Sequence, residues 1–185
     1  MIGRSVRGRL LVATPTLLDP NFLRTVLLML EHGEEGALGV VINRPSDSEL
    51  AGPLPAWAPL AAEPAVLFLG GPVAPANVVG LARVWPEPDG EGLMPILGRV
   101  AVVDLNLDPN ALGAMVEEVR AFAGCAGWEA GQLEAEIGIG AWFVVDGVAD
   151  DVLSPRPKEL WSTVLRRQGG RLAMFATFPP EVSSN

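Results

Sequence analysis

Two residue types that often carry out nucleophilic or acid–base chemistry occur once each in this chain, as His32 and Cys125. A thiolate–imidazole pair could act as a nucleophile and its base if the fold brought the two together. Nothing in their spacing indicates such a pair, and a lone cysteine is more typical of a small buried side chain. His32 stands in the polar loop His32–Gly36, where a structural hydrogen bond or a solvated position is a simpler interpretation than a general base. We therefore predict no catalytic residue.

The segment Asn43-Arg44-Pro45, at the end of an apolar run, is a second candidate. The guanidinium fork of Arg44 can hold the carboxylate of a small anionic ligand, or it can pair inside the protein with Asp19 or Asp47. The Asn43 amide can satisfy the backbone groups that a strand leaves unpaired where it ends. We expect Arg44 to stabilise the fold first and to present an anion-binding face second.

Trp128 and Gln132 complete the candidate ligand-binding or structural polar cluster, which therefore comprises His32, Asn43, Arg44, Trp128 and Gln132. Trp128 is expected in the core rather than as a platform for a ligand. A zinc site built on thiolate and imidazole would lack ligands, and the acidic residues are interpreted as solvated surface. No Walker-type loop, GxGxxG fingerprint or GxSxG elbow occurs. We predict no metal and no cofactor.

Short apolar runs bounded by glycine, proline or charged residues are typical of strands. The runs Val26–Leu30 and Leu38–Ile42 flank the polar loop and predict an antiparallel hairpin, around which the rest of the chain is organised. A further strand candidate is residues 78–84. We expect one mixed, strongly curved sheet that contains residues 9–13, 26–31, 38–43, 66–69, 99–105 and 141–145.

The pattern also predicts helices. Asp108 can cap and Pro109 can begin a helix over Pro109–Ala123, which should pack on the sheet. Further helices are predicted over Trp128–Ile137 and Lys158–Gln168. Arg171–Phe178 is compatible with strand or helix, and the proline-rich Ser46–Pro64 is compatible with a broken helical turn or a packed loop. Without steady β-α alternation, the order of elements indicates an α+β fold, with residues 1–185 as a single domain.

The composition excludes some classes of function. The net charge is -9 and Lys158 is the only lysine, so direct binding to DNA is not expected. A local exception to this acidic balance is a modest basic face, which could be formed by Arg156, Lys158, Arg166, Arg167 and Arg171. No segment has the uninterrupted apolar length of a membrane span, and a single cysteine fits a reducing cytoplasm. We therefore expect a cytoplasmic protein.

Several motifs together resemble the YqgE/AlgH family of bacterial proteins. They are GRLLVATP with LLDPNF near the start, LEHGEEGALGVVINRPSD in the centre, FLGGPV, AGWEAGQLEAEI and LWSTVLRRQGG. The resemblance implies a single α+β domain whose bifurcated sheet folds into a pseudo-barrel with helices packed around it. The family is largely uncharacterised, is labelled as transcriptional regulators, and has no established catalytic residues to carry over. Cys125 stands where the family pattern leads us to expect an aromatic residue.

These observations favour a non-enzymatic binding or regulatory module that acts through a protein partner or a small anionic ligand rather than through DNA. The alternative is an enzyme that acts on a small acidic substrate, for example by hydrolysis, in a pocket near His32, Asn43 and Arg44. Convergence of these three side chains on one concave pocket would favour the enzyme.

Overall fold

The hairpin predicted from the two apolar runs is present in the computed structural model, which describes residues 4–87 and 90–179. Strand β2 (Val26–Gly33) pairs antiparallel with β3 (Gly36–Val41). Leu27 and Met29 contact one hydrophobic cluster, whereas Leu28 and Leu30 contact another on the opposite face. Both faces of β2 are therefore buried, which explains why its sequence is a continuous apolar run rather than an alternating one.

Within the described residues, the strands form one ten-stranded sheet in the order β10-β1-β2-β3-β9-β6-β8-β7, with the β4–β5 pair attached to β9. Because β5 runs parallel to β9, the sheet is mixed, and it branches at β9. All six predicted strand segments lie in it, so the predicted α+β fold is confirmed. The remaining strands are β1 (Leu10–Ala13), β4 (Pro45–Glu49), β5 (Val66–Leu69), β6 (Val73–Val84), β7 (Leu93–Leu97), β8 (Val100–Val103), β9 (Val116–Glu129) and β10 (Trp142–Val145).

The helices are short. The third predicted helix is confirmed as η3 followed by α3, and α4 shows that the ambiguous segment after Gly170 is helical. Ser46–Pro64 contains most of β4, a strand that was not predicted, and the single turn η1, which agrees with the predicted broken helical turn. No helix among residues 4–87 and 90–179 is long and apolar enough to cross a membrane. The α-helices are α1 (Gln132–Gly138), α2 (Ala149–Val152), α3 (Leu160–Gln168) and α4 (Gly170–Phe175), and the 3-10 helices are η1 (Ala58–Leu60), η2 (Pro109–Met115) and η3 (Pro157–Glu159).

The predicted helix Pro109–Ala123 is wrong over most of its length. Asp108 does cap Asn110 and the helical turns of η2 begin at Pro109, but they end at Met115. Gly113 interrupts them with φ 62° and ψ −150°. From Val116 the chain continues as β9, the longest strand described. Residues of β9 contact three hydrophobic clusters along its length, so its apolar residues lack the period of two and imitate helical spacing.

The predicted second helix begins too early. Trp128 is on β9, and α1 begins only at Gln132, after a left-handed Gly131 with φ 77°. Trp128 and Gln132 are therefore not on one helix face. The expectation that Trp128 belongs to the core is confirmed, because it is buried.

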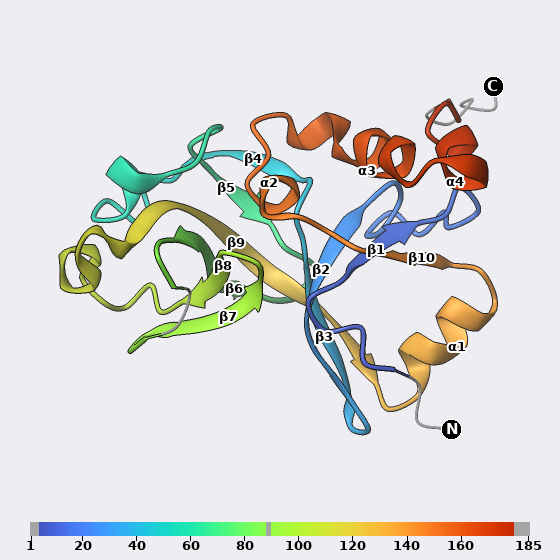
Figure 1. The fold of residues 1–185 in the computed structure, drawn as a ribbon, viewed down its shortest axis with the longest axis horizontal. Helices are drawn as coiled ribbons and strands as arrows, with labels where there is room; N and C mark the ends of the chain where they lie inside the picture. Colours follow the sequence, from blue (N-terminus) through green and yellow to red (C-terminus); the bar gives the residue numbers. More distant parts are fainter. Residues whose placement is uncertain (1–3, 88–89, 180–185) are drawn as a thin grey trace.

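Two clusters cover the two faces of the β10-β1-β2-β3 part of the sheet. The α3 core contains Leu10, Val12 and Leu28 with Leu160, Trp161, Val164 and Leu165 of α3. The α1 core contains Leu11, Leu27, Met29 and Val41 with Trp128, Leu133 and Trp142. Figure 1 shows α3 and α4 on one side of β1 and β10, and α1 on the other side. The hairpin is thus held between two cores.

Strand β9 crosses the molecule toward α1 (Figure 1), and along its length it changes the face that it presents to the two cores. Phe122 contacts the α3 core, whereas Ala126 and Trp128 contact the α1 core. Residues four apart on a regular strand point to the same face. Gly124, with φ 76°, lies between these residues and supplies the irregular backbone that the change requires.

Candidate functional site

The tip of the β2–β3 hairpin projects beyond the cores and packs against the end of β9. His32 pairs with Ala37, Gly33 pairs with Gly36, and Gly36 pairs with Glu129. Gly36 has φ 137°, and a Cβ at this position would overlap the carbonyl oxygen of Trp128. The glycine-containing loop therefore places the hairpin tip directly beside Trp128.

His32 is held by both of its ring nitrogens. The backbone N–H of Val6 donates to Nδ1 across 3.0 Å, and Nε2 lies 2.7 Å from Oε1 of Glu134. Because Nδ1 accepts a hydrogen bond, Nε2 carries the proton and donates it to the carboxylate. The side chain is only 5% exposed. His32 therefore connects the N-terminal segment, β2 and α1, and it makes no pair with Cys125.

The carboxylate of Glu134 is held in its charged form at the start of α1. The pKa of Glu134 is lowered first by a hydrogen bond from its own backbone N–H and then by the hydrogen bond from His32. An acidic group in the first turn of a helix also interacts favourably with the exposed N–H groups there.

Glu136 joins Trp128 and Gln132 to the α1 core. Its Oε2 accepts hydrogen bonds from Nε1 of Trp128 at 2.8 Å and from Nε1 of Trp142 at 2.9 Å. Its Oε1 accepts one from Nε2 of Gln132 at 3.1 Å. The rings of Phe22, Trp128 and Trp142 stack or meet edge to face around this carboxylate. The role of Glu136 was not predicted from the sequence, although its place four residues after Gln132 could have indicated it.

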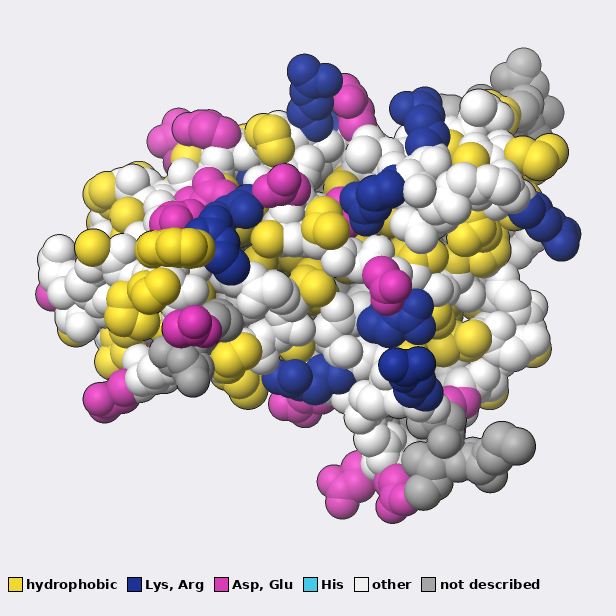
Figure 2. Space-filling view, viewed as in Figure 1, with side chains coloured by type: hydrophobic (Ala, Val, Ile, Leu, Met, Phe, Trp, Pro, Cys, Tyr) yellow, Lys and Arg dark blue, Asp and Glu magenta, His cyan; other side chains and the backbone are white. Residues whose placement is uncertain are grey.

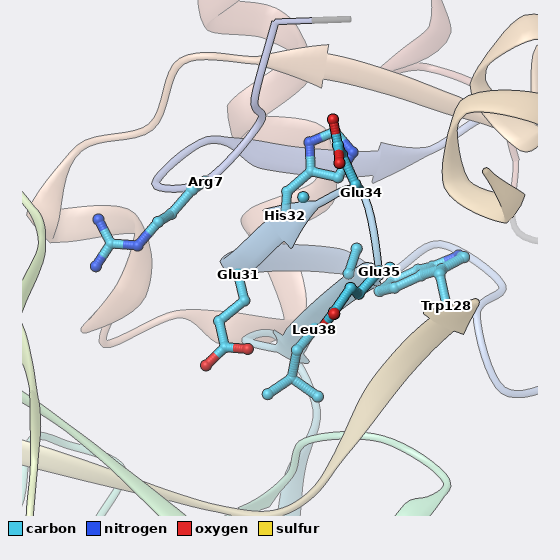
Figure 3. Close-up of a pocket in the computed structure, with 10 residues that line it drawn as sticks. Arg7, Glu31, His32, Glu34, Glu35, Leu38 and Trp128 are labelled. Atoms are coloured by element: carbon cyan, nitrogen blue, oxygen red, sulfur yellow. The ribbon is translucent and has the colours of Figure 1, made fainter. Parts of the chain in front are cut away.

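A hollow of about 560 Å³ lies beside the hairpin tip. Figure 3 shows that Glu31 and Leu38, which pair across β2 and β3, extend side by side, with Arg7 across from them. The Nη2 of Arg7 donates to the carbonyl oxygen of Pro95, 2.9 Å away. The hollow is lined by Arg7, Glu31, His32, Gly33, Glu34, Glu35, Gly36, Ala37, Leu38 and Trp128.

The hollow is acidic. Glu31, Glu34 and Glu35 are exposed, and in the part of the chain that the structure describes none of them forms an ion pair. Acidic side chains occupy the projecting hairpin tip at the bottom of Figure 2. Three glutamates and one arginine line the hollow, so it combines an apolar surface with net negative charge, which attracts cations.

Asn43 and Arg44 are at the other end of the hairpin. Oδ1 of Asn43 accepts from the backbone N–H of Val26 at 2.9 Å, and Nδ2 donates to the carbonyl oxygen of Arg24 at 2.9 Å. The amide therefore fixes the strand end in the predicted way. Arg44 does not pair with Asp19 or Asp47. It donates to three carbonyl oxygens of the preceding loop, those of Pro20, Asn21 and Leu23.

Burial lowers the pKa of the Arg44 guanidinium. The negative charge of Asp19 raises this pKa, but by less than burial lowers it. Carbonyl oxygens replaced the expected carboxylate because the loop before β2 turns its backbone toward the strand end. The guanidinium of Arg44 therefore donates its hydrogen bonds within the protein.

The structure does not bring the predicted cluster into one pocket. Asn43 contacts Val26, and His32 is six residues further along β2, so the two side chains are roughly 20 Å apart at the rise of an extended strand. His32 and Trp128 line the hollow, whereas Asn43, Arg44 and Gln132 do not.

Known proteins match nearly the whole chain. A UPF0301 protein of Streptomyces coelicolor is 50% identical over 98% of this chain and 96% of its own length. A UPF0301 protein of Rhodococcus opacus is 46% identical over 96% of this chain and 90% of its own length. The sequence similarity therefore extends through both ends of the hairpin and both cores.

Two solved structures share the fold. A crystal structure of a Corynebacterium diphtheriae protein superposes with a TM-score of 0.89 and 34% identity, covering 96% of this chain and 95% of that one. The solution structure of the AlgH protein from Pseudomonas aeruginosa superposes with a TM-score of 0.69 and 32% identity, covering 98% and 100%. A family model described as AlgH-like matches residues 10–173. The chain belongs to the AlgH-like family, as the resemblance of its motifs predicted.

Proposed function

We propose that this protein is a non-enzymatic binding module, and that the acidic hollow at the hairpin tip receives a cationic, partly apolar segment of a protein partner. The observation that supports this most strongly is the Glu31–Leu38 pair, which presents a carboxylate and an apolar side chain next to each other on an accessible surface. A regulatory role of the kind implied by the family resemblance would then be exercised through this partner.

The chemistry of the hollow favours lysine or arginine side chains. Their charged ends can approach the carboxylates of Glu31 and Glu35, while their methylene stems pack on Leu38. The whole chain carries a net charge of -9, so a basic partner is also attracted from a distance. By the same reasoning a small anionic ligand is disfavoured here, since three glutamates line the hollow.

The enzyme alternative receives no support from the geometry. It requires His32, Asn43 and Arg44 to act together, but these side chains are at opposite ends of the hairpin and each already has structural hydrogen bonds. An acidic substrate would in addition meet the charge of Glu31, Glu34 and Glu35. We retain the binding module as the better explanation.

Direct DNA binding is also disfavoured. Two residues of the basic face considered from the sequence are in ion pairs, Arg167 with Asp151 and Arg156 with Glu159. Binding to DNA is driven by the counterions that are released when Lys and Arg side chains neutralise phosphates. It therefore requires clustered Lys and Arg that are not already paired within the protein.

Fluorescence anisotropy with a labelled peptide of alternating lysine and leucine tests the proposal. We expect saturable binding that weakens as salt is raised from 50 to about 300 mM, because salt screens exposed charges. Glu31→Gln combined with Glu35→Gln should weaken it at least about fivefold, and Leu38→Asn should weaken it independently of salt. Glu49→Gln removes an exposed carboxylate from β4, away from the hollow, and serves as the matched control.

Equal binding of a peptide of alternating glutamate and leucine would contradict the proposal. So would an affinity for the lysine peptide that the double variant leaves unchanged. Photo-crosslinking from position 38 in cells should then identify the natural partner, whose crosslinked segment we expect to be basic.

A further inference from the structure

A second hollow of about 350 Å³ lies between the β4–β5 pair and η3. Its apolar wall consists of Val66 and four prolines, Pro45, Pro64, Pro155 and Pro157. Proline has a fixed φ and no N–H group, so such a wall is rigid and leaves no backbone donor unsatisfied at these positions. A rigid apolar hollow is a typical feature of a small-molecule site, and its volume is at the low end of the range for such sites, about 300–1,000 Å³.

A buried arginine fixes the two walls relative to each other. Arg120 of β9 is 1% exposed, and its guanidinium lies over the Phe68 ring, 4.3 Å from the ring centroid. Nη2 donates to the carbonyl oxygen of Glu63 at 2.6 Å, and Nη1 donates to that of Ser154 at 2.9 Å. These residues directly precede Pro64 and Pro155, one on each wall. The hollow is therefore formed before any ligand arrives, which reduces the entropic cost of binding.

The two walls carry opposite charges that do not meet. Asp47 is exposed on the β4 side, and Lys158 is exposed on the η3 side. Within the described residues neither side chain forms an ion pair or a hydrogen bond. The other two charged residues of the lining, Arg156 and Glu159, pair with each other at 3.8 Å. One negative and one positive group thus remain on opposite sides of an apolar surface.

We propose that this hollow binds a small zwitterion with an apolar body, of which a hydrophobic α-amino acid is the simplest example. Lys158 holds the carboxylate, Asp47 holds the ammonium group, and the side chain packs on the prolines and Val66. The size of the hollow limits the ligand to one apolar side chain beside its charged groups. This site is separate from the hairpin hollow, so it stands or falls independently of the proposed function.

Titration of the isotope-labelled protein with L-phenylalanine, followed by amide NMR, tests this site. We expect saturable shifts at the amides of Ser46, Val66 and Lys158, with the hairpin amides unchanged. 2-Phenylethylamine lacks the carboxylate and 3-phenylpropionate lacks the ammonium group, so each should bind about tenfold more weakly. Glycine has both charges but no apolar body, and it should produce no saturable shift.

Lys158→Gln and Asp47→Asn should each weaken phenylalanine binding about tenfold, because each leaves one charge of the ligand without its partner. Glu49→Gln on the same strand and Arg171→Gln on α4 are matched controls that should leave it unchanged. Shifts that fail to saturate, or 3-phenylpropionate binding as tightly as phenylalanine, would overturn the proposal. Unchanged affinity in both hollow variants would overturn it as well.

Discussion

His32 on β2 donates to Glu134 on α1 across 2.7 Å, although 102 positions separate the two residues in the sequence. This contact attaches α1 to the hairpin and makes the attachment sensitive to acid. The pKa of Glu134 is lowered in the folded protein, so at acidic pH the unfolded chain binds more protons there than the folded one. The stability that Glu134 contributes is therefore present above its ordinary pKa of 4.5 and is lost as the pH falls below that value.

Urea denaturation of the parent and of Glu134→Gln between pH 7 and pH 3 checks this expectation. The parent should be the more stable at pH 7, and the difference should shrink as the pH falls through about 4.5. Glu129→Gln, an exposed substitution at the end of β9, should show a smaller change with pH. A difference that is constant across the range contradicts the predicted linkage.

Arg44→Ala should destabilise the protein by on the order of 2–4 kcal/mol, because three carbonyl oxygens of the loop before β2 lose their donor. Chemical denaturation measures the loss. Arg171→Ala removes an exposed guanidinium from α4 and should change stability by less than about 0.5 kcal/mol. An Arg44→Ala variant as stable as the parent would favour an anion-binding role instead.

Glu136→Ala should cost about 2 kcal/mol, since two indole N–H groups in the α1 core lose their shared acceptor. The near-ultraviolet circular dichroism of the tryptophans should weaken at the same time. Glu136→Gln keeps an acceptor oxygen and should retain more of both the stability and the signal. If the alanine variant keeps the parent spectrum, the carboxylate does not order the rings.

Arg120→Ala should be among the most destabilising substitutions, by about 3–5 kcal/mol, because it opens a cavity and leaves buried carbonyl oxygens unpaired. Burial lowers the pKa of Arg120 to about 10, and among the described residues its Nε has no hydrogen-bond partner. Arg120→Met fills more of the space and should recover part of the loss in thermal denaturation. Equal stability of the alanine and parent proteins would contradict the structural role.

Local patterns were sufficient to predict the hairpin and most of the other strands. Val26–Leu30 forms β2 because a continuous apolar run suits a strand buried on both faces. The role of Asn43 was predictable for a similar reason, since a strand end must satisfy its own nearby backbone groups.

The errors arose where partners distant in sequence decide the structure. Val116–Glu129 has helical spacing, but pairing with β3 and β6 makes it a strand. The partners of Arg44 and His32 were equally unpredictable, since each depends on a segment brought close by the tertiary fold. The hollow beside the hairpin could not be predicted either, because Arg7 and Trp128 reach it from distant parts of the chain.

The irregular backbone at Gly124 makes the length of β9 matter as much as its composition. Phe122 and Trp128 are assigned to different cores only because the strand changes face between them. A deletion of one residue that left the irregular backbone at Gly124 in place would put Trp128 on the same face as Phe122 and turn it away from Glu136. Evolution can therefore vary individual residues on either side of Gly124 far more freely than the number of residues between the two cores.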